Sequence, residues 1–397
     1  MTTLDHSPDQ ARSGWWPFAA AAFAFLVAMM GTTLPTPIYA LYEQQFHLSQ
    51  FMITVIYAVY AAGVIGALLL TGTWSDQIGR KPLLFAGLAL SLVSGICFAL
   101  SGGLWGILLA RVLSGLSAGL FASTATAAVM DLVPEGQERA GILTATGVNM
   151  GGLGLGPLVA GAVVQYLPDP MLTPYLVHIA LVILAGLAFL TVPETVARAD
   201  HPDLAPQRPT LPSEVAGVFL PAALVAIAGF MVTGFYSAVV PSFLADPMGY
   251  HSHFLVGFVA GFLFLASTAG QILADTLPGR SHLKLGCVVL TLGVLVIAAG
   301  LWAETLWGLL PGTLIAGLGH GLAFRSGLGA VGSAAPEARR GSTIALYFTI
   351  SYLAISVPVV LVGLAGLLWA LKPVSIAFAL LSALLSLLAL WRIRGRD

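Results

Sequence analysis

The chain has 397 residues, of which 58% are hydrophobic and only 8% are charged. Soluble domains carry about 25% charged residues, so this composition excludes a water-soluble globule. The formal net charge of -1 leaves no basic surface for nucleic acid. The two cysteines, Cys97 and Cys287, lie far apart in apolar stretches and offer neither a disulfide framework nor a metal site.

Long stretches without Asp, Glu, Lys or Arg recur along the whole chain. A helix that crosses a bilayer needs about 20 mostly apolar residues. Twelve stretches meet this requirement when two single arginines, Arg111 and Arg325, are allowed inside them. The connections are too short for a soluble domain, so the sequence predicts an all-α integral membrane protein with twelve transmembrane helices. The predicted spans lie within residues 13–42, 48–75, 82–100, 104–130, 140–168, 170–193, 215–245, 254–274, 285–303, 305–331, 341–369 and 373–391.

The distribution of basic residues predicts the orientation. The first apolar run is longer than the core of a signal peptide, which has about 7–15 residues, so we expect a retained first helix. Lys and Arg in short loops stay on the cytoplasmic side. We therefore expect both termini to be cytoplasmic, in the plasma (cytoplasmic) membrane, which is the inner membrane of a cell that has two. The basic residues that share this side are Arg12, Arg80, Lys81, Arg139, Arg198, Arg208, Arg280, Lys284, Arg339, Arg340, Arg392, Arg394 and Arg396.

The longest connection, residues 193–213, contains five prolines and is predicted to be a flexible cytoplasmic linker. It separates residues 1–192 from residues 214–397, with six spans in each part. An internal repeat relates the two parts, so we expect two pseudosymmetric six-helix bundles with a binding site between them. The matched pairs are Gly115-Leu116 with Gly317-Leu318, Gly119-Leu120 with Gly321-Leu322, Pro134-Glu135 with Pro336-Glu337, and Pro157 with Pro358.

The loop after the second span, residues 72–81, reads GTWSDQIGRK. This string resembles the cytoplasmic loop signature of the major facilitator superfamily, and the resemblance extends over nearly the whole chain. It implies a transporter that alternates access around a central cavity. Gln77 stands where the family usually has a Lys or Arg, which should weaken the gate. We expect the cytoplasmic gate to be formed by Asp76, Gly79, Arg80 and Lys81.

In the fifth span, residues 152–161 read GLGLGPLVAG, which resembles the signature of the family's antiporter branches. Glycines four residues apart let helices approach closely, and a proline removes one helical hydrogen bond. The resemblance implies export, and residues 34–37 also resemble the proline motif of twelve-span drug/proton antiporters. Ordinary small-residue packing is the alternative. The residues expected to form a hinge are Gly152, Gly156, Pro157 and Gly161.

Arg111 lies about 10 Å into the fourth span at 1.5 Å per residue, and its surroundings resemble the family's membrane-embedded arginine motif. A guanidinium at this depth must face the interior and find acceptors. The sequence has no carboxylate at mid-span depth. The candidate partners are therefore Asn149, hydroxyls, carbonyls or an anionic group of a substrate. Arg325 lies near the end of its span, where we expect its side chain to reach the interface.

Proton coupling needs a group that titrates as the cavity alternates. His320 is a candidate because the resemblance places its helix at the central cavity, and a packing role is the alternative. Glu43, Asp246 and His178 are the other titratable candidates. Tyr39 and Tyr236 could line the cavity by stacking on a ligand or bonding to it, or they could anchor their helices at the interface. With Arg111 and Asn149, the residues expected to act in substrate or proton coupling are therefore His320, Tyr39 and Tyr236.

We predict a secondary active transporter that exports a small amphipathic or drug-like compound in exchange for protons. An importer or facilitator of a polar or anionic metabolite is the alternative, which Arg111 would suit. A transport-inactive sensor is less favoured, because no soluble domain could relay a signal. We expect no enzyme, cofactor or metal, and a monomer. The remaining enzymatic alternative is an intramembrane serine hydrolase that pairs Ser117 with His178. Residues 115–119 match the sequence of a nucleophile elbow, but they lack the preceding strand that this motif requires.

Overall fold

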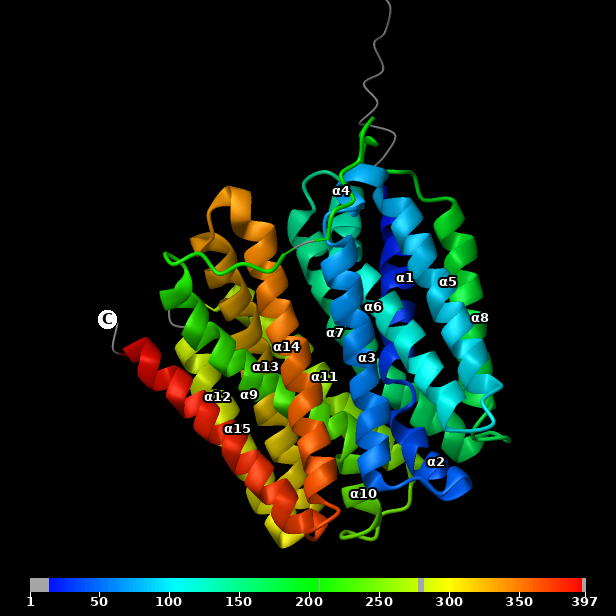
Figure 1. Ribbon diagram of the computed structural model, residues 1–397, viewed down its shortest axis with the longest axis vertical. Helices are drawn as coiled ribbons and strands as arrows, with labels where there is room; N and C mark the ends of the chain where they lie inside the picture. Colours follow the sequence, from blue (N-terminus) through cyan, green and yellow to red (C-terminus); the bar gives the residue numbers. More distant parts are fainter. Residues whose placement is uncertain (1–13, 207, 278–281, 395–397) are drawn as a thin grey trace, which may run out of the picture.

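The computed structural model describes residues 14–206, 208–277 and 282–394, which form helices joined by turns and one longer linker (Figure 1). Twelve helical segments among them are long and apolar enough to cross a membrane, which confirms the predicted all-α fold. Arg12, Arg280 and Arg396, used above for the orientation, lie outside the described residues. The elements are α1 (Trp15–Thr33), η1 (Thr36–Ile38), α2 (Tyr39–Phe46), α3 (Gln50–Thr71), α4 (Ser75–Ile78), α5 (Arg80–Ala99), α6 (Leu104–Leu132), α7 (Glu138–Tyr166), α8 (Thr173–Leu190), α9 (Ala216–Ala238), α10 (Val240–Ala245), α11 (His253–Thr276), α12 (His282–Ala303), α13 (Leu306–Ala334), η2 (Glu337–Arg339), α14 (Arg340–Ala365) and α15 (Leu371–Arg394).

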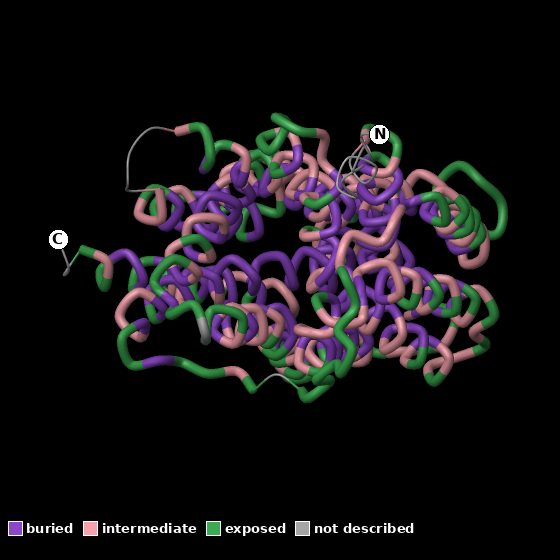
Figure 2. The backbone as a smooth tube through the Cα atoms, turned by 90° about the horizontal axis from the view of Figure 1, so that it is seen from above, coloured by how far each residue is buried: buried purple, intermediate pink, exposed green. Residues whose placement is uncertain are grey.

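The helices stand in two bundles side by side. Figure 1 shows the N-terminal bundle, α1 to α8, on the right and the C-terminal bundle, α9 to α15, on the left. The linker between α8 and α9 runs over one end of the molecule, which we call the linker end, and we call the opposite end the far end. Seen along the helices, buried backbone fills the interior and exposed backbone forms the rim (Figure 2).

Prolines break the first helix of each bundle near the far end. α1 ends at Thr33, and the chain passes through Pro35 and a short 3-10 turn before α2 begins. In the C-terminal bundle, α9 ends at Ala238 and α10 continues with Pro241 in its first turn. Because proline has no backbone N–H, it cannot continue a helical hydrogen-bond ladder without a gap. Each bundle therefore has an interrupted helix at the same end.

The outer surface suits a lipid bilayer. α15 exposes a stripe of leucines that includes Leu380, Leu384 and Leu388, and other outward faces are similarly apolar. The most exposed tryptophans lie at helix ends, such as Trp16 at the linker end and Trp307 at the far end. Tryptophan is enriched at both membrane interfaces because its ring is amphipathic. The chain is therefore an integral membrane protein with its helices across the bilayer.

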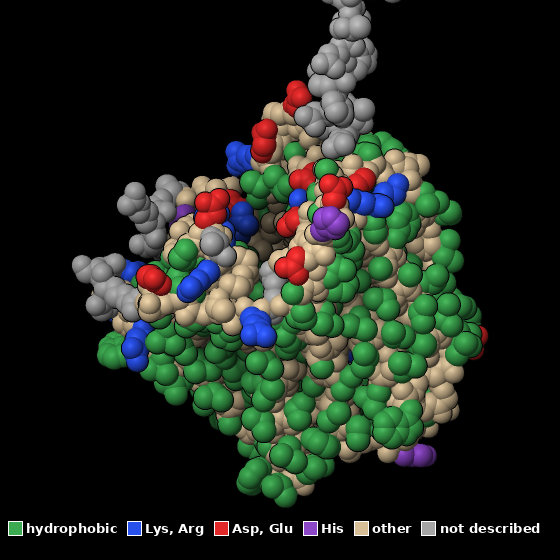
Figure 3. Space-filling model, turned by 45° about the horizontal axis from the view of Figure 1, so that its top comes forward, with side chains coloured by type: hydrophobic (Ala, Val, Ile, Leu, Met, Phe, Trp, Pro, Cys, Tyr) green, Lys and Arg blue, Asp and Glu red, His purple; other side chains and the backbone are tan. Residues whose placement is uncertain are grey.

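Close backbone contacts join the two bundles between mid-span and the far end. A methyl group built on Gly154 of α7 would lie 2.9 Å from the Gly261 carbonyl of α11, and one built on Gly161 would lie 3.1 Å from the Gly257 Cα. Further towards the far end, His253 Nδ1 lies 3.3 Å from the Pro37 carbonyl oxygen. At the linker end, charged side chains surround a hollow between the bundles (Figure 3). The bundles are thus closed together at the far end and apart at the linker end.

Candidate functional site: a cavity between the two bundles

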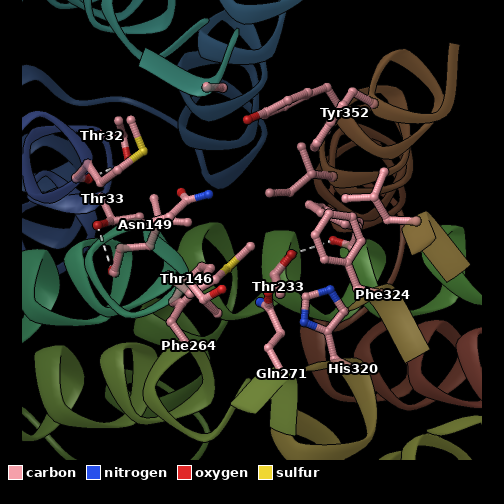
Figure 4. A pocket seen from close by; sticks show the side chains of 18 of the residues that line it. Thr32, Thr33, Thr146, Asn149, Thr233, Phe264, Gln271, His320, Phe324 and Tyr352 are labelled. Atoms are coloured by element: carbon pink, nitrogen blue, oxygen red, sulfur yellow. Dashed lines mark hydrogen bonds between the residues drawn. The ribbon is translucent and has the colours of Figure 1, made fainter. Parts of the chain in front are cut away.

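A cavity of about 250 Å³ lies between the bundles and takes its walls from both (Figure 4). Its lining combines aromatic rings with uncharged polar side chains. Among the described residues that line it, Arg325 is the one with a permanent charge, and none is Asp or Glu. The N-terminal bundle contributes Thr32, Thr33, Tyr57, Tyr60, Thr126, Thr146 and Asn149, and the C-terminal bundle contributes Phe230, Thr233, Phe264, Gln271, His320, Phe324 and Tyr352, together with further apolar residues.

His320 lies where the sequence analysis expected it, on the cavity wall. The glycines beside it let α13 approach its neighbours, because a side chain on Gly319 would strike α12 and one on Gly321 would strike Ser267 of α11. Its Nδ1 lies 2.9 Å from the Ser267 hydroxyl, and the Phe230 ring packs against it edge to face at 5.1 Å. His320 is 2% exposed, and its Nε2 has no hydrogen-bond partner among the residues that the structure describes.

Gln271 is a second polar group on the same wall, and the sequence analysis missed it. It lies on α11 one turn after Ser267 and is 6% exposed, and within the described ranges its Nε2 has no hydrogen-bond partner. An uncharged amide within an apolar span is costly unless it faces the protein interior and has a use there. The presence of an amide in an apolar span could therefore have identified Gln271, which lies in the eighth predicted span, as a candidate site residue.

On the N-terminal wall, Asn149 and Thr146 of α7 line the cavity beside Thr33 of α1. Thr33 also explains how the proline in α7 is accommodated. Pro157 has no N–H to donate to the Leu153 carbonyl four residues earlier, and the Thr33 hydroxyl donates to that oxygen instead, at 2.8 Å. The expected hinge is therefore bonded to α1, and its glycines Gly152 and Gly156 pack against the same helix.

Arg111 is fully buried but does not line the cavity. Its guanidinium donates to the carbonyl oxygens of Thr32, at 2.7 Å, and of Ile56 and Tyr57, at 3.3 and 3.4 Å. Its Cζ also lies 4.8 Å from the centre of the Tyr60 ring. The last carbonyls of α1 lack helical partners, so the arginine supplies donors to a helix end and joins α1 to α3 and α6.

The two tyrosines of the expected site also lie away from the cavity wall in this conformation. Tyr39 is 1% exposed and follows the break in the first helix. The Tyr236 hydroxyl lies 2.6 Å from the Thr313 hydroxyl within the C-terminal bundle. Of the five residues expected to act in substrate or proton coupling, the structure brings Asn149 and His320 together at the cavity.

The loop of residues 72–81 forms a charged network at the linker end. Gly79 has φ 101°, a conformation that favours glycine, and the side chain of Arg80 pairs with Asp131 at 2.6 Å and with Asp76 at 3.7 Å. The Glu194 carboxylate accepts hydrogen bonds from the backbone N–H groups of Arg80 and Lys81, at 2.9 and 3.1 Å. A carboxylate at a helix N-terminus is stabilised there.

Gln77, which departs from the family pattern, bonds to the linker. Its Nε2 donates to the Asp203 carbonyl at 2.8 Å, its Oε1 accepts from the Asp203 N–H, and its backbone carbonyl accepts from Ala199. Arg325, on the other bundle, forms two contacts of 3.0 Å with Asp275 at the cavity mouth. Arg325 was expected to reach the membrane interface, and in the structure an ion pair with Asp275 fixes its side chain.

The residues of the hydrolase alternative do not form a pair. The Ser117 hydroxyl donates to the Gly87 carbonyl at 2.7 Å, while His178 Nε2 lies 3.2 Å from the Ser91 hydroxyl. Both residues border a small void of about 10 Å³ inside the N-terminal bundle. A serine that donates to a carbonyl is not activated by a histidine as a nucleophile requires.

Comparison with known proteins agrees with this architecture. A family model described as Major Facilitator Superfamily matches residues 21–359. The "Putative multidrug resistance protein MdtD" of Salmonella typhimurium is 30% identical over 210 residues, which is 51% of this chain and 42% of that protein. The protein of the same name from Salmonella newport is 32% identical over 171 residues, which is 42% of this chain and 34% of that protein.

The alignments with these relatives thus cover less than half of their length. The family model, by contrast, takes in helices of both bundles, from α1 through most of α14. Two bundles of six spans each are the architecture that the internal repeat predicted, and a central cavity between them is what the resemblance implied. The chain belongs to the major facilitator superfamily.

Proposed function

We propose that the chain is a secondary active transporter that works by alternating access and exports a small amphipathic or drug-like compound in exchange for protons. The observation that carries this proposal is the cavity between the bundles, closed at the far end and hollowed towards the linker end (Figure 3). Rocking of two repeats around a fixed central site is how such carriers move a substrate. The names of the relatives support a drug-like substrate.

The direction of transport depends on which end faces the cytoplasm. The linker end carries Arg80, Arg139 and Arg392, whereas Lys372 lies at the far end. Basic residues in short loops stay on the cytoplasmic side, so we assign the linker end to the cytoplasm and the chain to the plasma membrane, as a monomer. A cavity open to the cytoplasm is the state in which an exporter takes up its substrate.

The moving parts follow from the contacts. The glycine crossing of α7 and α11 allows the bundles to tilt against each other, since backbone meets backbone at Gly154, Gly161, Gly257 and Gly261. Thr33 keeps α1 bonded to α7 at Pro157 during this tilt. The pair of Arg80 and Asp131 holds the linker end of the N-terminal bundle together, so that it closes as one body over the loaded cavity.

A proton must bind and leave in step with this movement, and Glu43 of α2 is well placed to carry it. Its carboxylate accepts a hydrogen bond of 3.4 Å from Ser242, which belongs to the other bundle. Ser242 has one proton to donate and also lies 2.7 Å from the Gln50 Oε1, so the carboxylate is only partly satisfied. Opening of the far end would break this contact and expose the half-buried Glu43 fully to water. We therefore propose Glu43 as the group that exchanges the proton.

The alternative of an anionic metabolite rested on Arg111. Three of the N–H groups of Arg111 donate to carbonyl oxygens, a tyrosine ring packs beside its guanidinium, and its side chain does not line the cavity, so Arg111 gives this alternative little support. A facilitator remains the competing proposal for the mechanism, since a cavity alone does not require coupling.

The test is proton movement in proteoliposomes that contain a pH-sensitive dye. Neutral amphiphiles, lipophilic cations and organic acids are added in turn to liposomes with the wild type, with Glu43→Gln, or with the matched surface control Glu138→Gln. We expect at least one compound to dissipate an imposed pH gradient with the wild type and the control but not with Glu43→Gln. Flux without a pH change would favour a facilitator, and absence of flux for every compound would refute transport.

A further inference from the structure

The wall of the cavity formed by α11 and α13 presents two polar nitrogen atoms that find no hydrogen-bond partner in the part of the chain that the structure describes. These are Gln271 Nε2 and His320 Nε2, and both side chains are more than nine-tenths buried. Figure 4 shows the two side chains on the same side of the cavity, and both residues line it. Buried polar groups without partners are rare in proteins, and each calls for an explanation.

The packing of α11 against α13 brings the two residues to the same wall of the cavity. Gly321, next to His320, packs against the backbone of Ser267 and of Gln271. A Cβ at Gly321 would lie 2.7 Å from the backbone nitrogen of Gln271. Ser267 in turn bonds to His320 Nδ1. Gln271 and His320 are therefore neighbours across a glycine contact, and the serine fixes the imidazole ring.

The hydrogen bond to Ser267 also determines what His320 offers to a ligand. Among the described residues, the Ser267 hydroxyl has no hydrogen-bond partner other than His320 Nδ1. When the hydroxyl donates to Nδ1, a neutral imidazole carries its hydrogen on Nε2. Gln271 Nε2 is a donor in every state. The two atoms then form a pair of donors that lacks an acceptor.

The charges around the cavity disfavour a cation. No carboxylate is found among its described lining residues, and Asp275 near the mouth is paired with Arg325. The rings of Tyr57 and Tyr60 already face the Arg111 guanidinium, at 5.5 and 4.8 Å. A cation here would lose its hydration without gaining a counter-charge, and Arg111 behind the tyrosines would repel it.

We propose that Gln271 and His320 form a subsite for an uncharged oxygen acceptor, such as a ketone or amide carbonyl, on a flat aromatic ligand whose rings pack on Phe230, Phe264 and Phe324. This inference rests on the proposed function and narrows its substrate class from amphipathic compounds to neutral aromatic carbonyl compounds. Phe324 stacks at 6.0 Å on His320, so an aromatic ligand that reaches the donors meets ring surfaces beside them.

The test measures equilibrium binding to purified protein in nanodiscs, without any gradient, using three probes with one ring skeleton. N-methylacridone carries the carbonyl, N-methylacridan lacks it, and N-methylacridinium replaces it with a positive charge. We expect the wild type to bind N-methylacridone about tenfold more tightly than either other probe, as a pair of hydrogen bonds to buried donors requires. Fluorescence titration gives all three affinities on the same sample.

Gln271→Leu and His320→Leu should each reduce the affinity for N-methylacridone towards that for N-methylacridan. The N-methylacridan affinity of the same sample should hold, which shows that the cavity remains folded. The matched control is His178→Leu, because His178 is also a buried histidine beside a glycine and bonded to a serine, but borders a separate void. This control should keep the preference for the carbonyl.

Equal binding of the three probes, tighter binding of the cation, or no binding of any probe would overturn the subsite. A carbonyl preference that survives both substitutions would overturn its assignment to Gln271 and His320. These failures are separate from failure of the proposed function, because flux of other compounds in the liposome assay would persist. Absence of all flux with intact N-methylacridone binding would instead refute transport and leave the subsite standing.

Discussion

Thr33 and Pro157 should be energetically coupled, although they lie on different helices. The Thr33 hydroxyl donates at 2.8 Å to the Leu153 carbonyl, which Pro157 leaves without its helical partner. Thr33→Val keeps the shape of the side chain and removes the donor. Side-chain hydrogen bonds within membranes average about 0.6 kcal/mol, and a buried group left unsatisfied costs about 1–3 kcal/mol. Because this site is partly buried, we expect a loss of about 1 kcal/mol.

A double-mutant cycle measures this coupling through unfolding by SDS in mixed micelles. In Pro157→Ala, residue 157 regains an N–H for the Leu153 carbonyl, so Thr33→Val should cost almost nothing in that background. Thr32→Val is the matched control, because the Thr32 hydroxyl donates to the Met29 carbonyl of its own helix. A Thr33→Val penalty that is equal in both backgrounds would refute the role we give to this hydrogen bond.

Three further substitutions test other parts of the structure. Arg111→Lys keeps the charge but loses the planar guanidinium that donates to carbonyls of α1 and α3. The midpoint of unfolding by SDS should therefore fall by the equivalent of about 2 kcal/mol. An unchanged midpoint would contradict the assigned contacts. Glu43→Gln should abolish proton release on substrate addition while substrate exchange between equal pools persists, whereas loss of both would make Glu43 structural. Gln77→Ala removes both side-chain hydrogen bonds to Asp203. Trypsin should then cut the linker at Arg198 severalfold faster. An unchanged rate of cleavage would show that these bonds do not hold the linker.

Apolar patterning was sufficient to predict the fold. The predicted spans match the twelve helices, because the length of an uncharged stretch depends on the bilayer and not on tertiary contacts. Pro35 and Pro241 lie where the first helix of each bundle breaks. These features are local, so they can be read from neighbouring residues.

The cavity was harder to predict, since the face that a residue presents depends on helix rotation. Arg111 and Tyr236 were expected to act at the site, but each side chain forms its hydrogen bonds inside its own bundle. Gln271 was overlooked because single amides give no motif. His320 was found because the resemblance places its helix at the central cavity. The hydrogen bond from Thr33 to the Leu153 carbonyl could not be predicted from the sequence, because it depends on the packing of α1 on α7.

Alternating access is the central claim, and distances between spin labels at the two ends test it most directly. One pair of labels at Glu135 and Glu337 occupies exposed, repeat-related loops at the linker end, and another pair at Gln45 and His251 spans the bundles at the far end. Alternating access predicts that a substrate or a pH change shortens the first distance and lengthens the second. Two distances that stay fixed, or that change in the same direction, would contradict it.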